Sequence, residues 1–473
     1  MAVSTFKRGL KLNTRKHATE GKAVEIAPLP RQVVIPVNQH FGAPNKVIVT
    51  IGEKVRRGQQ IAEAMAPGPM TAPVHASISG VVKKIEPRSL SNNTEGLCVI
   101  IEADSETGEE GELFMFPLDP FSCSKEEALQ RIRDAGIIGM GGAGFPAHVK
   151  LSPPPNKPVD TIIANAAECE PYLTTDEALL AEKTGALVKG LAIVMKILRV
   201  NKAIIGIEDN KAGIIPVIEE EVRKGNYPGE IKAGLCRTRY PQGSEKMLIT
   251  ALTGREVPSG GLPMDCGCIV SNVGTLVGIA EAFTLGKPLI DRDLTVSGGA
   301  CKQPKNIRVP VGAILTDLPK EFIDIDFQRL RKVIFGGPMM GTSTALVDAP
   351  IQKNTSGIIL MTEAETAVNE EGSCIRCGRC LGKCPMRLTP VAINIALNEN
   401  NLDEAVKVGL LDCIECGSCA YICPARVMLT QRFRTGKQKL KIRQALSKEA
   451  EDAVKKAAET KAAAFHLTPP ENS

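Results

Sequence analysis

The chain has 473 residues, of which 43% are hydrophobic, 23% are charged and 3% are aromatic, and it contains no tryptophan. This is the composition of a folded soluble protein with room for about three domains, whose cores must rest on aliphatic side chains. The net charge of +5 is modest, and by itself it gives no reason to expect nucleic acid as a partner.

Cysteine usage and the lack of long apolar runs predict where the protein works. The chain has 15 cysteines, and its basic first residues, MAVSTFKRGLKLNTRK, lack the apolar core of a signal peptide. The longest apolar stretch, residues 190–200, is interrupted by Lys196 and Arg199, so no segment reaches the roughly 18 apolar residues that a membrane span needs. We expect reduced thiols in a cytoplasmic protein whose contact with a membrane is peripheral.

Residues 1–115 are expected to form a small β domain. Short runs rich in Val and Ile, such as VVIPV and KVIVTIGEKVRRGQQIAEA, alternate with Gly and Pro as in a barrel or a sandwich. The Glu- and Gly-rich residues 106–112 predict an exposed turn at the end of this segment.

Residues 125–288 change to alternating helices and strands. Helices are expected at KEEALQRIRDAG and at residues 174–198, 211–224 and 244–252, and Thr174 with Glu177 matches a capping box. Apolar strands are expected at residues 159–166, 202–207 and 231–236. Repeated β–α units of this kind predict a parallel sheet covered on both faces, with its ligand at the carboxyl ends of the strands.

The rest of the chain is predicted to form three segments. Residues 289–362 contain strands punctuated by Gly and Pro and are expected to form a small α+β module, and a polar linker leads from it to a cysteine-rich domain at residues 365–430. Residues 431–473 form a polar basic tail, expected to be one exposed helix and a disordered end. Arg432 to Arg443 holds six Lys and Arg and no acid, which favours a solvated helix, with contact to a membrane surface or an acidic partner as the alternative.

The cysteine-rich domain contains two copies of one metal-binding pattern. CIRCGRCLGKCP begins at Cys374 and CIECGSCAYICP begins at Cys413, and both follow C-x2-C-x2-C-x3-C-P. With this spacing three thiolates wrap one [4Fe–4S] cube and the fourth reaches the other cube. We therefore assign one cluster to Cys374, Cys377, Cys380 and Cys423, and the other to Cys413, Cys416, Cys419 and Cys384.

The residues between these cysteines agree with iron–sulfur clusters. Gly378 and Gly417 let backbone N–H groups approach the sulfides, and Pro385 and Pro424 end the two loops. The alternative is a pair of zinc sites, but zinc usually shows paired C-x2-C knuckles with four ligands a site. The segment resembles the bacterial two-cluster ferredoxin domain, which implies a wire for single electrons.

A glycine loop precedes the first predicted β–α unit. GMGGAGFPAHVK, from Gly139, presents backbone N–H groups that can face a phosphate, although a tight turn is the commoner role of such a loop. NAAECEP from Asn165 and SNVGTL from Ser271 lie at strand ends, and YPQGSEK from Tyr240 opens a helix. In this order the four segments resemble the NADH-binding flavoprotein subunit of respiratory complex I.

This resemblance implies a site for FMN and NAD(H). Gly141, Gly142, Gly144 and Lys150 would cradle the FMN phosphate and the nicotinamide cofactor, and Asn165 and Glu168 would contact FMN. Glu170 and Glu245 would lie by the nucleotide, and Asn272 by the flavin phosphate or ribityl chain. Gly139, Phe145 and Tyr240 complete the implied cofactor-binding set.

The chain departs from this family at four positions. Met140, Ala167, Ser244 and Gly274 stand where the family has Arg, Asp, Glu and Glu. Taken singly, Lys150 is an ordinary solvated lysine, and the three glutamates are charges near helix ends. Only the whole constellation favours a flavin site.

Over nearly its whole length the sequence resembles the RnfC family, the peripheral subunits of the Rnf ion-translocating oxidoreductase. FGAPNKVIVTIGEKVRRGQ, VHASISGVV, GMGGAGFPAHVKL, AECEPYLT and YPQGSEK show this resemblance. It implies a barrel-sandwich front, a β-grasp-like module at residues 289–362, and electron exchange between NADH, FMN and the clusters at the cytoplasmic face of the membrane. A ferredoxin would be reached through neighbouring subunits, which would also translocate the ion.

Other interpretations stay open at this point. The fold could be a docking relay that has lost its flavin, or the flavoprotein of a soluble hydrogenase or formate dehydrogenase complex. The front also resembles biotinyl and lipoyl carrier domains, but Ala66 and Pro67 occupy the hairpin tip where a carrier has its lysine, so we expect a structural role. The remaining cysteines are expected to be buried or reduced thiols: Cys98, Cys123, Cys169, Cys236, Cys266, Cys268 and Cys301.

Overall fold

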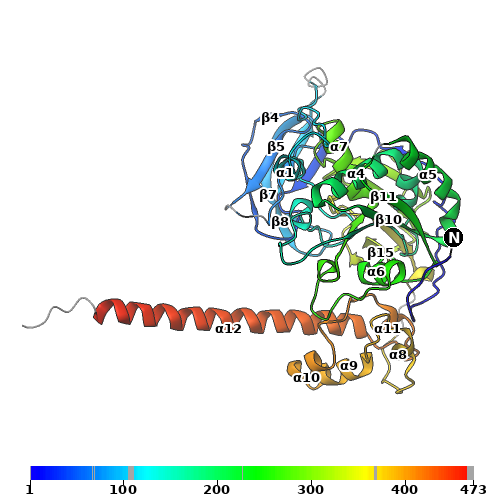
Figure 1. The fold of residues 1–473 in the computed structure, drawn as a ribbon, viewed down its shortest axis with the longest axis vertical. Helices are drawn as coiled ribbons and strands as arrows, with labels where there is room; N and C mark the ends of the chain where they lie inside the picture. The colour runs from blue at the N-terminus through cyan, green and yellow to red at the C-terminus, as the bar shows by residue number, and fades with distance from the viewer. Residues whose placement is uncertain are drawn as a thin grey trace, which may run out of the picture. The chain divides into compact units, whose positions relative to one another are not determined.

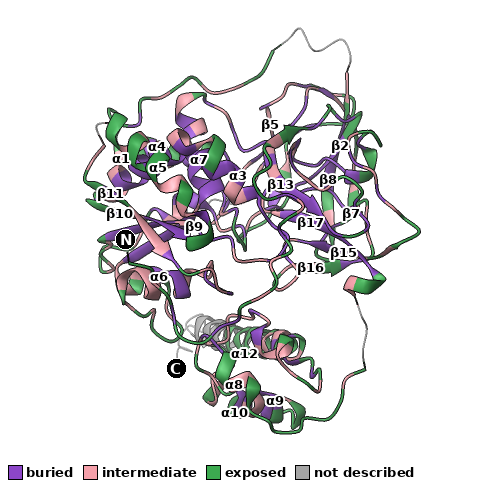
Figure 2. Cartoon of the chain, turned by 90° about the vertical axis from the view of Figure 1, so that its right-hand side faces the viewer, coloured by how far each residue is buried: buried purple, intermediate pink, exposed green. Residues whose placement is uncertain are grey.

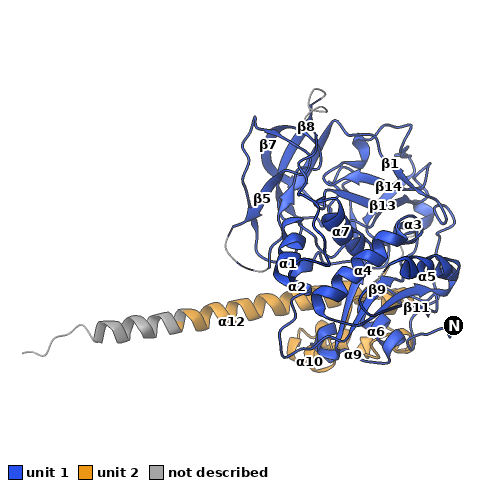
Figure 3. Ribbon diagram, turned by 45° about the horizontal axis from the view of Figure 1, so that its top comes forward, with its two compact units in different colours: residues 1–368 blue, residues 369–473 orange. Residues whose placement is uncertain are grey.

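The computed structural model divides into two compact units, residues 1–368 and residues 369–473 (Figure 3). It describes the whole chain except residues 1, 66–67, 69, 105–110, 226, 367–369 and 466–473, together with the side chains of residues 453 and 455–465. The hairpin tip with Ala66 and Pro67 and the chain end predicted to be disordered lie outside the described residues. The exposed turn predicted at residues 106–112 and the polar linker lie partly outside them.

The front of the chain forms the predicted barrel-sandwich. One antiparallel sheet has the order β2-β8-β7-β4 and a second has the order β3-β5-β6. Alternate residues such as Val33 and Ile35 on β2 face Ile101 and Val99 on β8 in a shared apolar core. The strands are β2 (Gln32–Pro36), β3 (Asn45–Val47), β4 (Lys54–Val55), β5 (Gln60–Ala64), β6 (Val74–His75), β7 (Gly80–Ser89) and β8 (Glu95–Ala103).

The middle of the chain forms the predicted parallel sheet. Its order is β11-β10-β9-β12, with β9 (Thr161–Ala166), β10 (Lys202–Glu208), β11 (Glu230–Cys236) and β12 (Cys268–Asn272) all parallel (Figure 1). Both faces are covered, because Ile162 packs into one apolar cluster and its neighbour Ile163 into another with Leu248. The helices are α1 (Lys125–Asp134), α2 (Ala147–Lys150), α3 (Thr175–Glu182), α4 (Thr184–Leu198), α5 (Ile215–Lys224), α6 (Glu245–Thr253) and α7 (Val273–Thr284), with 3-10 helices η2 (Asp209–Ile214) and η3 (Pro263–Cys266).

The single helix predicted at residues 174–198 is wrong, because the chain breaks at Lys183 into α3 and α4. The predicted capping box is also absent, since the Thr174 side chain makes no cap hydrogen bond. Its hydroxyl instead bonds Thr19 at 2.8 Å and Asn306 at 2.9 Å. The Thr174 hydroxyl, which the sequence pattern assigns to a helix cap, is thus used in contacts between distant parts of the chain.

The third sheet has six strands in the order β1-β14-β13-β17-β15-β16. β13 and β17 are largely buried in it (Figure 2). Residues 24–26 join this sheet rather than the barrel, because β1 runs parallel to β14. The strands are β1 (Val24–Ile26), β13 (Asp291–Ser297), β14 (Lys305–Pro310), β15 (Leu330–Phe335), β16 (Thr342–Thr344) and β17 (Gly357–Thr362), accompanied by 3-10 helices η4 (Leu315–Asp317) and η5 (Glu363–Glu365).

The second unit is helical. An apolar core including Ile393, Leu410 and Phe433 holds its short helices together, and the predicted tail helix is α12, which begins at Leu429. None of the helices formed by the described residues combines the length and the apolar character required of a membrane span. The helices are α8 (Arg379–Lys383), α9 (Pro390–Asn398), α10 (Leu402–Lys407), α11 (Ser418–Tyr421) and α12 (Leu429–Phe465).

We expect Gly190→Val to destabilise the first unit. A Cβ at Gly190 on α4 would lie 2.0 Å from the carbonyl oxygen of Leu276 on α7, so the two helices pack backbone against backbone. The free energy of unfolding, measured with urea, should fall by about 3 kcal/mol. Gly213→Ala is the control, because a Cβ there meets nothing within 4 Å. Unchanged unfolding of the Gly190 variant would contradict this packing.

Candidate functional site

The glycine loop between α1 and α2 is closed by backbone hydrogen bonds and open on one side. The amide of Gly139 donates to the carbonyl of Phe145 at 2.8 Å. Gly144 has a φ of +66°, and a Cβ there would lie 3.1 Å from the carbonyl oxygen of Gln39, so this turn requires glycine. A Cβ at Gly142 would meet nothing within 4 Å. The loop therefore leaves room beside Gly142 for a bound group.

The back of the loop rests on a buried guanidinium. Arg292 on β13 is 3% exposed; its Nη1 lies 2.9 Å from Sδ of Met140, and its Nη2 donates to the Met140 carbonyl at 3.3 Å. A Cβ at Gly274 would lie 3.4 Å from the same guanidinium. Two departures from the flavoprotein family, Met140 and Gly274, thus make room for a cation from another strand.

The ends of β9 and β12 bring two predicted site residues together. Asn165 and Asn272 are partners in the register of the two parallel strands. The amide of Asn165 donates to the carbonyl of Gly243 at 2.8 Å, and that of Asn272 donates to Asp176 at 2.8 Å. A Cβ at Gly141 would lie 3.1 Å from Cβ of Asn272. The glycine loop therefore lies against the carboxyl edge of the sheet, as the sequence predicts for a ligand site.

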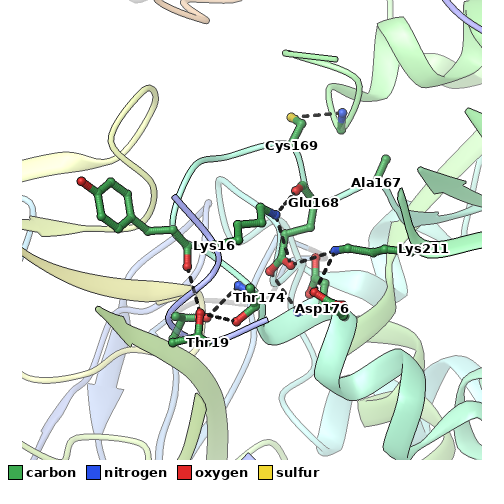
Figure 4. A network of polar contacts seen from close by, with 12 residues as sticks. Lys16, Thr19, Ala167, Glu168, Cys169, Thr174, Asp176 and Lys211 are labelled. Atoms are coloured by element: carbon green, nitrogen blue, oxygen red, sulfur yellow. Dashed lines mark hydrogen bonds and ion pairs between the residues drawn. The ribbon is translucent and has the colours of Figure 1, made fainter. Parts of the chain in front are cut away.

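Glu168 is buried between two lysines beneath this edge (Figure 4). Its carboxylate lies 3.7 Å from Nζ of Lys16 and 3.4 Å from Nζ of Lys211, and it accepts the backbone N–H of Asp176 at 3.0 Å. Lys16 also donates to the backbone carbonyl of Glu168. Burial opposes ionisation, but the two lysines outweigh it and lower the pKa of Glu168. Glu168 is thus an ionised anchor and not a solvated helix-end charge.

Asp176 is the titratable group beside this anchor. Its pKa is raised to about 7, first by burial and next by the nearby charge of Glu168, against the opposing effects of Arg292, Asn272 and Lys211. A carboxyl group with such a pKa can take up or release a proton near neutral pH. Its carboxyl group is hydrogen-bonded to Asn272, which lies against Gly141 of the glycine loop.

Glu170 and Tyr240, both in the implied cofactor set, are engaged inside the protein. Glu170 accepts the backbone N–H groups of Met339 and Met340 at 3.0 and 2.9 Å, and burial raises its pKa to about 7. A Cβ at Gly337 would lie 2.3 Å from its carboxylate. Tyr240 is 2% exposed and hydrogen-bonds Glu170. The structure thus places these residues between the α/β domain and the third sheet.

Lys150 and Glu245 meet at a more exposed position. Their charged groups are 3.6 Å apart, and the side chains are 30% and 42% exposed. Phe145 stacks on Phe41 with ring centroids 6.2 Å apart. Lys150 and Glu245 are accessible from solvent, in contrast to Glu170 and Tyr240.

The predicted second set of cysteines lines one cavity. Cys384, from the first motif, lies there with Cys413, Cys416 and Cys419 of the second motif. Burial raises the pKa of Cys413 to about 11 and that of Cys419 to about 12, and the neighbouring thiols of the set add to the shift. A thiol must lose its proton to bind a metal, so four cysteines around one cavity can serve as thiolate donors only when a metal centre occupies it. This cavity and its donors fit a [4Fe–4S] cube.

The predicted first set is more open. Cys374 and Cys377 are exposed, and burial and the thiol of Cys374 raise the pKa of the partly buried Cys380. Cys423 packs at the edge of the core of the second unit. In the described part of the chain no three His, Cys, Asp or Glu side chains are placed to share a single ion. Cysteines around a cube stand farther apart than that, because iron and sulfide atoms lie between them.

Sequence reasoning missed four charged residues of the first unit: Lys16, Asp176, Lys211 and Arg292. Asp176 lies in the first turn of α3, where an acidic residue is a usual helix-start signal, and this hides its role. Lys16 lies in a basic N-terminal stretch that differs in no way from a solvated one. No local pattern could have paired it with a glutamate 152 positions away.

Three protein-family models match the chain. They are the RnfC barrel sandwich hybrid domain at residues 4–106, the Nuo51 FMN-binding domain at residues 132–281 and the 4Fe-4S dicluster domain at residues 366–424. Together with the glycine loop and the cysteine cavity, they define an electron-transfer protein with FMN and iron–sulfur clusters.

Curated relatives match over most of their length. The chain is 44% identical over 408 residues to the C component of the proton-translocating ferredoxin:NAD(+) oxidoreductase complex of Clostridium ljungdahlii, covering 85% of this chain and 86% of that protein. It is 40% identical to the Na(+)-translocating counterpart of Acetobacterium woodii, covering 92% and 97%. It is 38% identical to the C component of the ion-translocating oxidoreductase complex of Rhodobacter capsulatus, covering 93% and 84%. The chain belongs to this family, the RnfC components of Rnf complexes.

We expect Lys16→Met to lower the free energy of unfolding by about 3 kcal/mol, because it leaves Glu168 with one of its two buried cations. Chemical unfolding at neutral pH measures the effect. Lys46→Met is the control, since Lys46 pairs with Glu63 at 3.1 Å on the surface, with both side chains about half exposed, and should cost less than about 1 kcal/mol. Equal losses in the two variants would show that Glu168 is not an anchor.

Asp176 should make stability depend on pH. The folded protein keeps this proton up to about pH 7, whereas the unfolded chain loses it near the usual value of 3.8. The wild-type protein therefore loses stability through this group as pH rises between these values, and the loss is complete above pH 7. Asp176→Asn has no such proton. The free energy of unfolding of the variant minus that of the wild type should rise by about 4 kcal/mol across this window, because the pKa of the group is about three higher in the folded protein than in the unfolded chain. A constant difference would contradict the raised pKa.

Proposed function

We propose that this chain passes electrons between NAD(H) and a ferredoxin as the peripheral subunit of an Rnf complex at the cytoplasmic face of the membrane. FMN would bind in the first unit and two [4Fe–4S] clusters in the second. Other subunits would translocate the ion and connect the chain to the ferredoxin. The names of the relatives support this assignment, since they are subunits of ferredoxin:NAD(+) oxidoreductase complexes.

One observation supports the flavin site most strongly, the position of the glycine loop against Asn272, the neighbour of Asn165 in the sheet register. The loop lies against the carboxyl edge of a parallel sheet, and the space beside Gly142 is open. Backbone N–H groups of Gly141, Gly142 and Gly144 would face the FMN phosphate. Asn165 and Asn272 would hold the flavin from the strand ends, with Glu168 fixing the edge from below. FMN, when bound, interconverts two-electron and one-electron transfer.

The remaining residues of the site have distinct tasks in this proposal. Lys150 and Glu245 lie where solvent reaches them, so they would exchange their ion pair for contacts with the nicotinamide nucleotide. Glu170 and Tyr240 would support the site from inside the protein. Asp176 would hold or release the proton that accompanies electron uptake, at its carboxylate oxygen beside Asn272.

The eight cysteines would hold two clusters, with each motif giving three ligands to one cluster and its fourth cysteine to the other. Cys384 lines the cavity of the second triplet, which supports a cube held by Cys413, Cys416, Cys419 and Cys384. The first cube would take Cys374, Cys377, Cys380 and Cys423. The domain limits predicted from the sequence, at residues 1–115, 125–288, 289–362, 365–430 and 431–473, remain part of this proposal.

We expect Cys374→Ala and Cys413→Ala each to remove one cluster, because a cube with three thiolates is poorly held. Iron and acid-labile sulfide in the purified chain should fall by about half, while FMN stays bound and NADH still reduces it. Ferredoxin-linked NAD⁺ reduction by the assembled complex should be lost. Cys301→Ala, at a buried cysteine of the third sheet, is the control and should keep every one of these properties.

Two results would overturn the proposal. Full ferredoxin-linked activity in both cysteine variants would show that the clusters are not the electron path. A purified wild-type chain that releases no FMN on denaturation would leave only a docking relay.

A further inference from the structure

The two cysteine loops of the second unit are copies with the same backbone. Arg376 and Glu415 occupy equivalent positions with φ of 55° and 56°, and Gly378 and Gly417 follow with 72° and 76°. Arg387 and Arg426 are equivalent as well, at 59° and 55°. Differences between the loops therefore arise from their side chains and from what covers them.

The second loop is covered by the start of α12. Lys437 donates to the carbonyl of Cys413 at 2.5 Å and pairs with Glu415 at 2.9 Å, and Arg434 pairs with Glu415 at 3.1 Å. Cys416 and Ser418 are buried. The first turns of α12 thus cover this loop and neutralise Glu415, its one acidic residue.

Among the described residues of the second unit, none gives the first loop such a cover. Each residue from Ser373 to Arg379 is exposed, and Ile375 is 67% exposed. The equivalent Ile414 is partly buried and lines the cysteine cavity. The two loops therefore differ in access, because the cysteine-bearing tip of the first loop is open where the second is covered.

The first loop is also basic where the second is not. Arg376, Arg379 and Lys383 are exposed and correspond to Glu415, Ser418 and Ile422. No ion pair to these three cations occurs within the described residues. Two acids precede the loop: Glu371 is paired with Arg432 at 2.8 Å, and Glu370 is exposed, so the loop with its approach carries three cations against one unpaired acid. We call Ile375, Arg376, Arg379 and Lys383 the basic face.

We propose that the basic face is the docking surface for an acidic protein, a partner that exchanges electrons with the cluster of Cys374, Cys377 and Cys380. This inference rests on the proposed function and adds the place and the charge of the partner. Arg is among the residues enriched in binding hot spots, and opposite charge speeds encounter and fixes orientation. One electron passes per encounter, and no bond forms or breaks.

An acidic protein fits these observations better than an anionic membrane. Lipid headgroups also attract Lys and Arg, but they accept no electrons. The exposed cysteines of this loop lie among the same cations. A redox protein that docks here makes use of both features.

Binding to the rest of the complex tests the proposal. Membranes that contain the complex without this chain are mixed with purified, cofactor-loaded chain, and the dissociation constant is measured at several salt concentrations. The variant R376E/R379E/K383E should bind about 100-fold more weakly at low salt and lose its salt dependence. The control K439E/K441E/K448E changes three exposed cations of α12 and should stay within about three-fold of the wild type. Equal effects of the two variants would overturn the proposal.

The partner is identified by cross-linking in the assembled complex. A carbodiimide should join Nζ of Lys383 to an Asp or Glu of another subunit, and mass spectrometry locates the linked peptides. A link to residues 1–368 of the same chain would overturn the proposal. So would wild-type binding to phosphatidylglycerol vesicles that is as tight as binding to the membranes and is lost in the triple variant.

Cofactor content tests the proposed function independently of the binding measurement. Iron, sulfide and FMN are measured in every preparation, and a wild-type chain without them speaks against the function. A fully loaded triple variant that binds like the wild type speaks against the basic face alone.

Discussion

The first unit depends on one buried carboxylate and the two lysines that neutralise it. An unpaired ionised group in this position would cost several kcal/mol, so Glu168 can exist there only because Lys16 and Lys211 approach it. Lys16 belongs to the N-terminal segment, Glu168 follows β9 and Lys211 lies in η2. A single electrostatic requirement therefore fixes three separate parts of the chain around the end of the central strand.

This requirement extends to the glycine loop. Glu168 accepts the N–H of Asp176, Asp176 accepts the amide of Asn272, and Asn272 lies against Gly141. Arg292 supports the same loop from behind through Met140. A flavin bound beside Gly142 would therefore rest on residues that have little freedom to move. Its proton could be exchanged with Asp176, the nearby group whose pKa lies near neutrality.

The second unit solves a different problem, which is to hold two similar centres in different surroundings. The repeat places equivalent cysteines on equivalent backbone, and α12 then covers only one of the loops. A covered centre and an exposed centre in one unit differ in how closely another protein can approach them. The loops differ in charge and in cover because residues such as Glu415 and Arg376, which occupy the same position in the repeat, differ in type.

Local patterns predicted a large share of this structure. The parallel sheet follows from alternating apolar strands and helices, and the crossing of Cys384 into the second cavity follows from thiolate spacing alone. The failures have one cause, contacts between distant residues. Thr174 bonds Thr19 and Asn306 and so forms no helix cap, β1 leaves the front domain for the third sheet, and Lys16 enters the core of a distant domain. Glu170 matches a nucleotide-binding motif, yet it bonds the backbone of Met339 and Met340, which the motif does not contain.

The FMN content of Gly142→Val tests the central claim most directly. A Cβ at Gly142 would meet nothing within 4 Å beyond its chain neighbours, so the substitution should leave the fold and the iron content unchanged and extend into the space assigned to the flavin. The account predicts one FMN per purified wild-type chain, at least ten-fold weaker FMN binding in Gly142→Val, and wild-type binding in Gly213→Val, which is equally open but lies in η2, outside the glycine loop. A Gly142→Val chain that holds FMN as tightly as the wild type would contradict the account.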